Sequence, residues 1–120
     1  MSGGLAEINY NDLHDSLQYT PQPNKFPVLV AYSSVEDPSL ISASENFQAA
    51  LKADGRLVVS CVHDGGHVVP PFEAQGEGEA SSAPLWRFLF DHSYGLEAGQ
   101  SPYLAGGLPE VFPDWCTVAK

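Results

Sequence analysis

Basic side chains are scarce in this 120-residue sequence, which has five Lys and Arg residues against fifteen Asp and Glu residues and a formal net charge of −10. Binding to nucleic-acid phosphates requires a cationic surface, and so does attraction to anionic lipid headgroups. We therefore expect no nucleic-acid partner and no membrane partner. The net negative charge chiefly favours solubility.

Long apolar runs and cysteines are also scarce. No apolar run approaches the roughly 18 to 20 residues that a membrane-spanning helix requires, and residues 1–5 have neither the basic nor the apolar part of a secretory signal. Two interpretations of the N-terminus stay open: a cytoplasmic mature protein, or a sequence that lacks its true N-terminus. The spacing of the two cysteines fits no zinc site, and we expect neither a metal nor another cofactor.

The hydrophobic content of 43% is sufficient for one globular domain or for a part of a larger one. Residues 1–25 are polar and rich in turn-forming residues, so we expect a connecting segment there. Residues 26–72 are predicted to form a βαβ unit, and residues 73–120 a C-terminal helix and tail. The expected fold class is therefore α/β.

The βαβ unit is predicted from two apolar runs and a helix between them. Residues 26–32 are a continuous apolar run of strand length, and residues 57–62 are a second run rich in β-branched side chains. Between the runs, Ser42 and Glu45 have the spacing of a helix capping box, and Gly55 stands where a helix end favours a left-handed residue. Two strands joined by such a helix are predicted to be parallel, with a right-handed crossover.

The loops that follow these two strands carry residues suited to proton transfer. Asp37 follows the first strand, and His67 follows the second after Gly65 and Gly66. Because the C-terminal ends of parallel strands meet at one edge of a sheet, we expect an Asp37–His67 pair, in which the carboxylate orients the imidazole as a general base. Glu36 competes for the role of the acid, and the alternative for Asp37 is an Asp-Pro turn or a residue on the approach to the helix. The alternative for His67 is a surface turn without a chemical role.

Other chemistry near His67 is less favoured. His63 lies four residues before His67, but Gly65 and Gly66 rule out the helical face on which such spacing binds a metal, so we assign His63 to support of the loop. Cys61 lies within the predicted strand, where a thiol is buried and unactivated, and it is therefore a poor nucleophile.

A second helix is expected from Pro84, a residue favoured in the first turn, to Asp91. Its large apolar side chains predict that it is mostly buried, with Trp86 in the core in preference to a role as a substrate platform. Four side chains are expected to anchor the tail on the domain surface: Tyr103, Leu108, Phe112 and Trp115.

An acidic residue after one strand, a crossover helix and a strand that ends in Gly-Gly-His resemble the C-terminal third of an α/β-hydrolase, where nucleophile, acid and histidine follow in that order. The resemblance narrows to the polyhydroxybutyrate-depolymerase and feruloyl-esterase-like hydrolases. It implies a small-molecule or polymeric ester substrate, with Asp37 as the catalytic acid and His67 as the catalytic base. The segments that carry the resemblance are residues 2–5, 61–71, 86–92, 106–109 and 112–116.

The nucleophile of such an enzyme is missing from the sequence. No Gly-x-Ser-x-Gly motif occurs, and residues 5–24 lack the helix and strand that should separate nucleophile and acid, so Ser2 is disfavoured as the nucleophile. We therefore expect residues 1–120 to be a partial α/β-hydrolase domain, a C-terminal fragment of a serine ester hydrolase whose partner is the missing N-terminal part. The alternative is a non-catalytic, truncated hydrolase-like interaction module.

We also hypothesise that Cys61 and Cys116 form a disulfide that ties the tail to the second strand. Its loss would cost roughly 2–5 kcal/mol in a small secreted domain. A disulfide would favour a secreted or periplasmic location.

Overall fold

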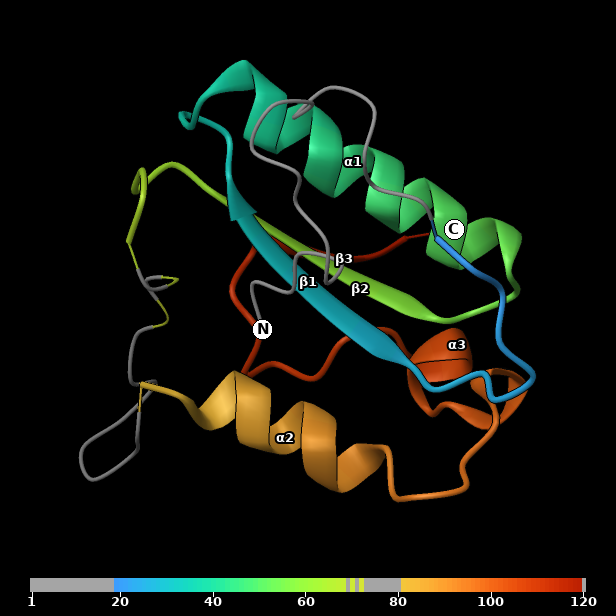
Figure 1. The fold of residues 1–120 in the computed structure, drawn as a ribbon. Coiled ribbons are helices and arrows are strands. Elements are labelled where there is room, and N and C mark those ends of the chain that lie inside the picture. The colour runs from blue at the N-terminus through green and yellow to red at the C-terminus, as the bar shows by residue number, and fades with distance from the viewer. Residues whose placement is uncertain (1–18, 69, 71, 73–80, 120) are drawn as a thin grey trace.

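A three-stranded mixed sheet lies at the centre of the computed structural model, which describes residues 19–68, 70, 72 and 81–119 (Figure 1). The expected connecting segment is thus described only from Tyr19 onward, where it contains no helix or strand before residue 28. Ser2 and the loop at residues 2–5 lie outside the described residues. In chain order the elements are β1 (Val28–Ser33), α1 (Pro38–Ala53), β2 (Val58–His63), α2 (Ala83–Asp91), the 3-10 turn η1 (Ala98–Gln100), α3 (Tyr103–Gly106) and β3 (Cys116–Ala119).

The predicted βαβ unit is confirmed, because β1 and β2 pair in parallel and α1 connects them. The sequence does not predict β3, which pairs antiparallel with β2 and makes the sheet mixed. The four residues of β3 do not alternate strictly between apolar and polar side chains, which is the pattern that indicates a half-buried strand. Cys116 at its start lies opposite Cys61 and forms a disulfide with it, with 4.0 Å between the two Cα atoms, which confirms the proposed pairing.

Helices cover both faces of this sheet (Figure 1). Successive side chains of a strand point to opposite faces, so Val30 and Val58 pack with Leu51 of α1 on one side. Leu29 and Val59, their neighbours in sequence, point to the other side, where α2, α3 and the tail lie. The sheet is thus the middle layer of three.

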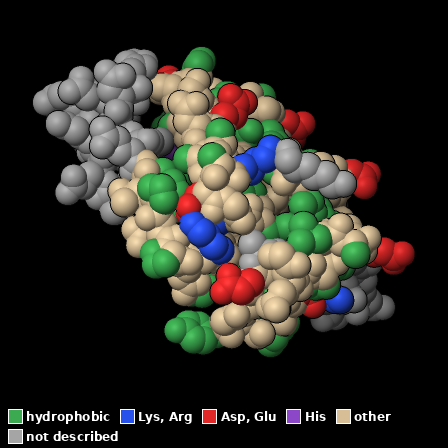
Figure 2. All heavy atoms as spheres, turned by 90° about the vertical axis from the view of Figure 1, so that its right-hand side faces the viewer, with side chains coloured by type: hydrophobic (Ala, Val, Ile, Leu, Met, Phe, Trp, Pro, Cys, Tyr) green, Lys and Arg blue, Asp and Glu red, His purple; other side chains and the backbone are tan. Residues whose placement is uncertain are grey.

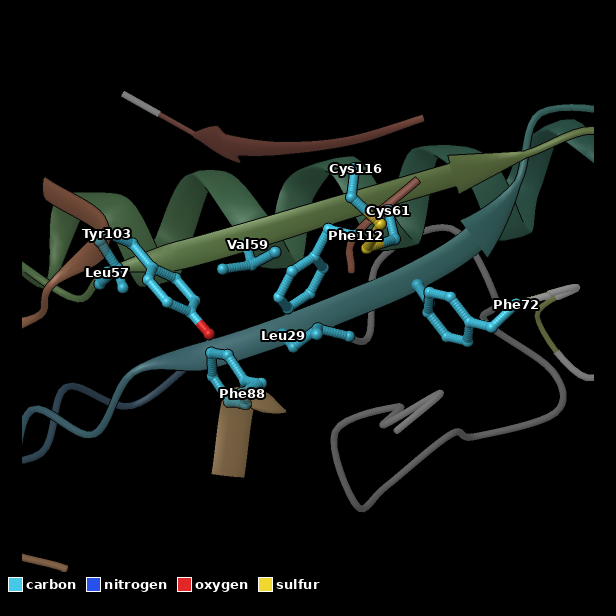
Figure 3. Close-up of a cluster of buried hydrophobic side chains, with 10 residues drawn as sticks. Leu29, Leu57, Val59, Cys61, Phe72, Phe88, Tyr103, Phe112 and Cys116 are labelled. Atoms are coloured by element: carbon cyan, nitrogen blue, oxygen red, sulfur yellow. A yellow bond between two sulfur atoms is a disulfide. The ribbon is translucent and has the colours of Figure 1, made fainter. Parts of the chain in front are cut away.

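The larger core lies on the side of α2 and α3, where aromatic rings from loop, helix and tail meet the strand side chains (Figure 3). Tyr103 and Phe112 are buried there, and Leu108 and Trp115 pack against the same core while partly exposed. All four predicted anchors of the tail are therefore confirmed. Trp115 also stacks on Phe72, with 4.9 Å between the ring centroids.

The start of α1 differs from the prediction. The helix begins at Pro38, and the Asp37 carboxylate caps it by accepting a hydrogen bond from the Ser39 N–H at 2.9 Å. Ser42 lies inside the helix, so the predicted Ser42–Glu45 capping box is wrong. An aspartate cap followed by proline supplies a complete helix start further upstream.

At the other end of α1, Gly55 has a φ of 77° and so confirms the expected left-handed residue.

Helix α2 has the predicted Pro84 in its first turn and ends at Asp91, but it is much more exposed than predicted. Trp86 is 56% exposed and Phe90 is 78% exposed, whereas Phe88 is buried. A short helix on the surface of a sheet buries only the stripe that faces the sheet. The prediction that Trp86 belongs to the core is therefore wrong.

No helix among the described residues is long and apolar enough to cross a membrane.

A cluster of charged and polar side chains fastens the segment before β1 to the turn between α1 and β2. Asp54 accepts hydrogen bonds from Tyr19, Lys25 and Arg56. Arg56 also donates to the backbone oxygen of Asn24 at 2.7 Å. Figure 2 views the side of the molecule on which α1 ends, where basic and acidic side chains lie next to one another.

Candidate functional site

The candidate site lies where β1 and β2 end, at the same edge of the sheet. Ser33 and His63, the last residues of the two strands, are opposite one another. The Ser34 N–H donates to the backbone oxygen of His63 at 2.7 Å, and the Ser34 hydroxyl donates to the same oxygen at 3.2 Å. The loops that leave this edge are therefore held together at their bases, and each carries one part of the predicted acid–histidine pair.

Glu36 is the carboxylate that the structure places against His67. Oε1 of Glu36 lies 3.0 Å from Nδ1 of His67, and the two side chains are 17% and 90% exposed, respectively. The Asp37 carboxylate bonds to the backbone and hydroxyl of Ser39, as the cap of α1. The sequence names both acidic residues as candidates. Glu36 contacts His67, and the Asp37–His67 pair stays a prediction.

The Glu36–His67 contact has the geometry of an oriented imidazole. A carboxylate at Nδ1 favours the tautomer with its proton on Nδ1, which leaves the lone pair of Nε2 for a proton from elsewhere. Because the His67 side chain is largely exposed, a reacting group from another chain or segment can approach Nε2. The pair can thus act as a general base, provided that a nucleophile is supplied.

His63 supports the loop, as the sequence indicates. Its side chain is buried, and Nδ1 accepts a hydrogen bond from the Gly65 N–H at 3.1 Å. A neutral His63 therefore carries its proton on Nε2. The ring also meets the edge of Trp115, with 5.9 Å between centroids, which links the loop to the tail.

The two glycines before His67 serve different purposes. Gly66 has a φ of 74°, in the left-handed region that L side chains rarely adopt. At Gly65, a Cβ atom would lie 3.2 Å from Nδ1 of His63 and 3.2 Å from Cγ2 of Val68. The backbone of Gly65 must approach His63 closely to donate its hydrogen bond.

A serine–histidine contact, which the sequence does not indicate, joins α2 to α3. Nε2 of His92 lies 2.7 Å from Oγ of Ser101, and Nδ1 of His92 lies 2.8 Å from the backbone oxygen of Phe88. Because that backbone oxygen only accepts, a neutral His92 carries its proton on Nδ1 and accepts the Ser101 hydroxyl proton at Nε2. No spacing motif signals this pair, since both residues lie in a segment rich in glycine and proline.

The His92–Ser101 contact is suited to structure and poorly suited to catalysis. Ser101 is only 5% exposed, and its Oγ also accepts the Tyr103 N–H at 3.2 Å, at the start of α3. The next residue, Pro102, has no N–H that could stabilise an oxyanion. We therefore regard the contact as a brace between α2 and α3.

No group of three or more His, Cys, Asp or Glu side chains that could hold a metal ion occurs within the described part of the chain. At the sheet edge, the Glu36–His67 contact is the arrangement that can take part in proton transfer.

Comparisons of the chain with protein-family models, with curated proteins and with solved structures find no match.

Proposed function

We propose that this chain carries the acid–histidine part of a serine ester hydrolase. The observation that supports the proposal is the 3.0 Å contact between Glu36 and His67 at the C-terminal edge of the parallel strands. In the proposed reaction, Nε2 of His67 takes the proton of a serine hydroxyl as the oxygen attacks the ester carbonyl. It then returns the proton to the departing alkoxide, while the carboxylate stabilises the imidazolium. Water repeats the two steps to release the acid.

The serine of this reaction is proposed to lie outside the 120 residues, in the N-terminal part of the same hydrolase. The sheet offers a place for that part, since β1 is an edge strand and no described strand pairs with its outer side. An open edge presents unpaired N–H and C=O groups to a further strand. On this proposal the domain is the C-terminal third of an α/β-hydrolase fold, and the substrate is a carboxylic ester, either a small molecule or a polymer.

Labelling with a fluorophosphonate tests the proposal in two steps. The 120-residue chain alone, shown to be folded by circular dichroism, should not be labelled at any serine. A protein extended upstream in the reading frame should be labelled at a serine in a Gly-x-Ser-x-Gly motif, and His67→Ala should abolish that labelling. Asp64→Ala is the matched control, because Asp64 is an exposed residue of the same loop, and it should retain labelling.

The same experiment identifies the acid. Glu36→Gln and Asp37→Asn keep the size of each side chain, and substitution of the true acid should slow labelling by about 10²–10⁴-fold. Labelling of the 120-residue chain that depends on His67 would show that a complete site assembles within it, which would contradict the placement of the serine. Labelling of the extended protein that persists in His67→Ala would overturn the role of His67.

The alternative function, a non-catalytic interaction module, is favoured by one observation. Trp86, Leu89 and Phe90 of α2 are all more than half exposed, and exposed apolar side chains in a group are typical of interaction surfaces. Absence of a Gly-x-Ser-x-Gly motif upstream would favour this alternative over the hydrolase.

A further inference from the structure

We propose that Ser33 is a positioning residue that fixes the two site loops relative to one another and so brings Glu36 to His67. The inference rests on the proposed function, because it assigns a role in the same site. Ser33 is the last residue of β1 and is 2% exposed. Its hydroxyl bonds to the backbone that precedes Glu36 and His67, so its action on the imidazole is indirect.

One oxygen atom connects the two loops. Oγ of Ser33 accepts the Gly66 N–H at 3.0 Å and the Val35 N–H at 3.2 Å. Val35 immediately precedes Glu36, and Gly66 immediately precedes His67. The hydroxyl therefore fixes the backbone directly before each member of the pair.

The Glu36–His67 contact needs such an anchor. An ion pair with one largely exposed partner gains little energy and does not by itself hold two loops in place. The glycines that precede His67 add conformational freedom to its loop. The bonds from Ser34 to His63 hold the strand ends and stop short of the loop residues that precede the pair.

The test measures how strongly Glu36 acts on His67. Nuclear magnetic resonance spectra of the isotope-labelled chain, recorded at one fixed pH, report the change in the His67 ring signals that Glu36→Gln causes. This change is compared in the wild-type, Ser33→Ala and Ser34→Ala backgrounds. In the Ser33→Ala background the change in the His67 ring signals should fall by about half or more, because Glu36 and His67 are no longer coupled. An unchanged response would overturn the inference.

Two controls separate positioning from loss of stability. Ser34→Ala should leave the response intact, because the Ser34 N–H still binds the His63 oxygen. Ser101→Ala also removes a buried hydroxyl that accepts a backbone N–H, but near α3, at the opposite end of the strands (Figure 1). It should destabilise the fold and leave the response unchanged. A loss of response in Ser101→Ala equal to that in Ser33→Ala would show that general destabilisation suffices, and would overturn the inference.

A measurement on the unmodified chain applies even where Ser33→Ala does not fold. The amides of Val35 and Gly66 share one acceptor, so both should be protected from hydrogen exchange under native conditions. Unprotected exchange of either amide hydrogen would contradict the two hydrogen bonds to the Ser33 hydroxyl. Neither experiment uses an ester or a nucleophile, so the positioning role can fail while the hydrolase proposal stands. Conversely, a fluorophosphonate result against the hydrolase would leave the measured coupling unchanged.

Discussion

Cys61 of β2 and Cys116 of β3 are direct partners in the antiparallel strand pair, and their sulfur atoms are bonded. The bond joins residues 55 positions apart and restricts the unfolded chain accordingly. We expect reduction to lower the free energy of unfolding by about 4 kcal/mol. Urea denaturation with and without a phosphine reductant measures the difference.

The double variant Cys61→Ala/Cys116→Ala is the control for that experiment, since it should be destabilised and insensitive to the reductant. Equal denaturation midpoints of the oxidised and reduced wild-type chain would contradict the prediction.

Acid should destabilise the protein partly through Asp54. Hydrogen bonds from Lys25, Tyr19 and Arg56 hold the pKa of this carboxyl well below its usual range, with Lys25 the largest cause. The stability that Asp54 contributes is therefore fully present above the ordinary carboxyl pKa of about 4. It is lost as the pH falls through the lower pKa that Asp54 has in the folded state. Urea midpoints measured from pH 6 downward should fall less steeply in Asp54→Asn.

Lys25→Met removes the largest cause of the lowered Asp54 pKa. In this variant too, the urea midpoint should fall less steeply as the pH decreases. A slope in Asp54→Asn identical to that of the wild-type chain would show that Asp54 does not contribute to the acid sensitivity.

Two glycines offer a matched comparison of backbone strain. Gly55 and Gly66 have φ values of 77° and 74°, and a Cβ atom at either would meet nothing within 4 Å. Substitution of each by alanine should therefore cost about 1–2 kcal/mol, from the left-handed conformation alone. Only Gly66→Ala should also alter the His67 ring signals, because Gly66 precedes the imidazole. Thermal unfolding gives the first result and resonance spectra the second. A negligible cost at Gly66 alone would show that its loop is not left-handed in solution.

Removal of the Ser101 hydroxyl should destabilise the connection between α2 and α3. Ser101→Ala leaves Nε2 of His92 and the Tyr103 N–H without their partner, at a cost of about 1–3 kcal/mol. Ser44→Ala removes an exposed hydroxyl on α1 that bonds to the Leu40 oxygen, and its cost should stay within about 0.5 kcal/mol. Chemical denaturation of both variants checks the contrast. Equal losses of stability in the two variants would show that the buried hydrogen bonds of Ser101 stabilise the fold no more than the bond of Ser44 does.

Much of the βαβ unit could be predicted because its signals are local. The apolar runs at residues 26–32 and 57–62 indicate strands buried on both faces, and β1 and β2 occupy most of them. Gly55 and Pro84 mark helix ends through their own backbone preferences. The start of α1 was harder to place, because two valid start signals compete and the capping spacing at Ser42 gives way to the Asp37–Pro38 start.

Other features depend on tertiary contacts that the sequence does not show. The exposure of Trp86 depends on which side of α2 the sheet covers, and composition alone cannot indicate that. Glu36 and Asp37 are adjacent and chemically alike, so the Glu36–His67 contact and the Asp37 helix cap depend on the direction of each side chain after β1, which the sequence does not show. The His92–Ser101 contact arises only because α3 folds back on α2.

The strand order has a consequence for the kinetics of folding. β1 and β2 are separated by the whole of α1, and β2 and β3 meet across 55 residues, so no two described strands form a hairpin. A sheet of this kind cannot start from a local turn, and each pairing must first close a long loop. A denatured chain that keeps its disulfide has already closed the longer loop. It should therefore regain the native state faster than the reduced chain, with the parallel pairing of β1 as the remaining slow search.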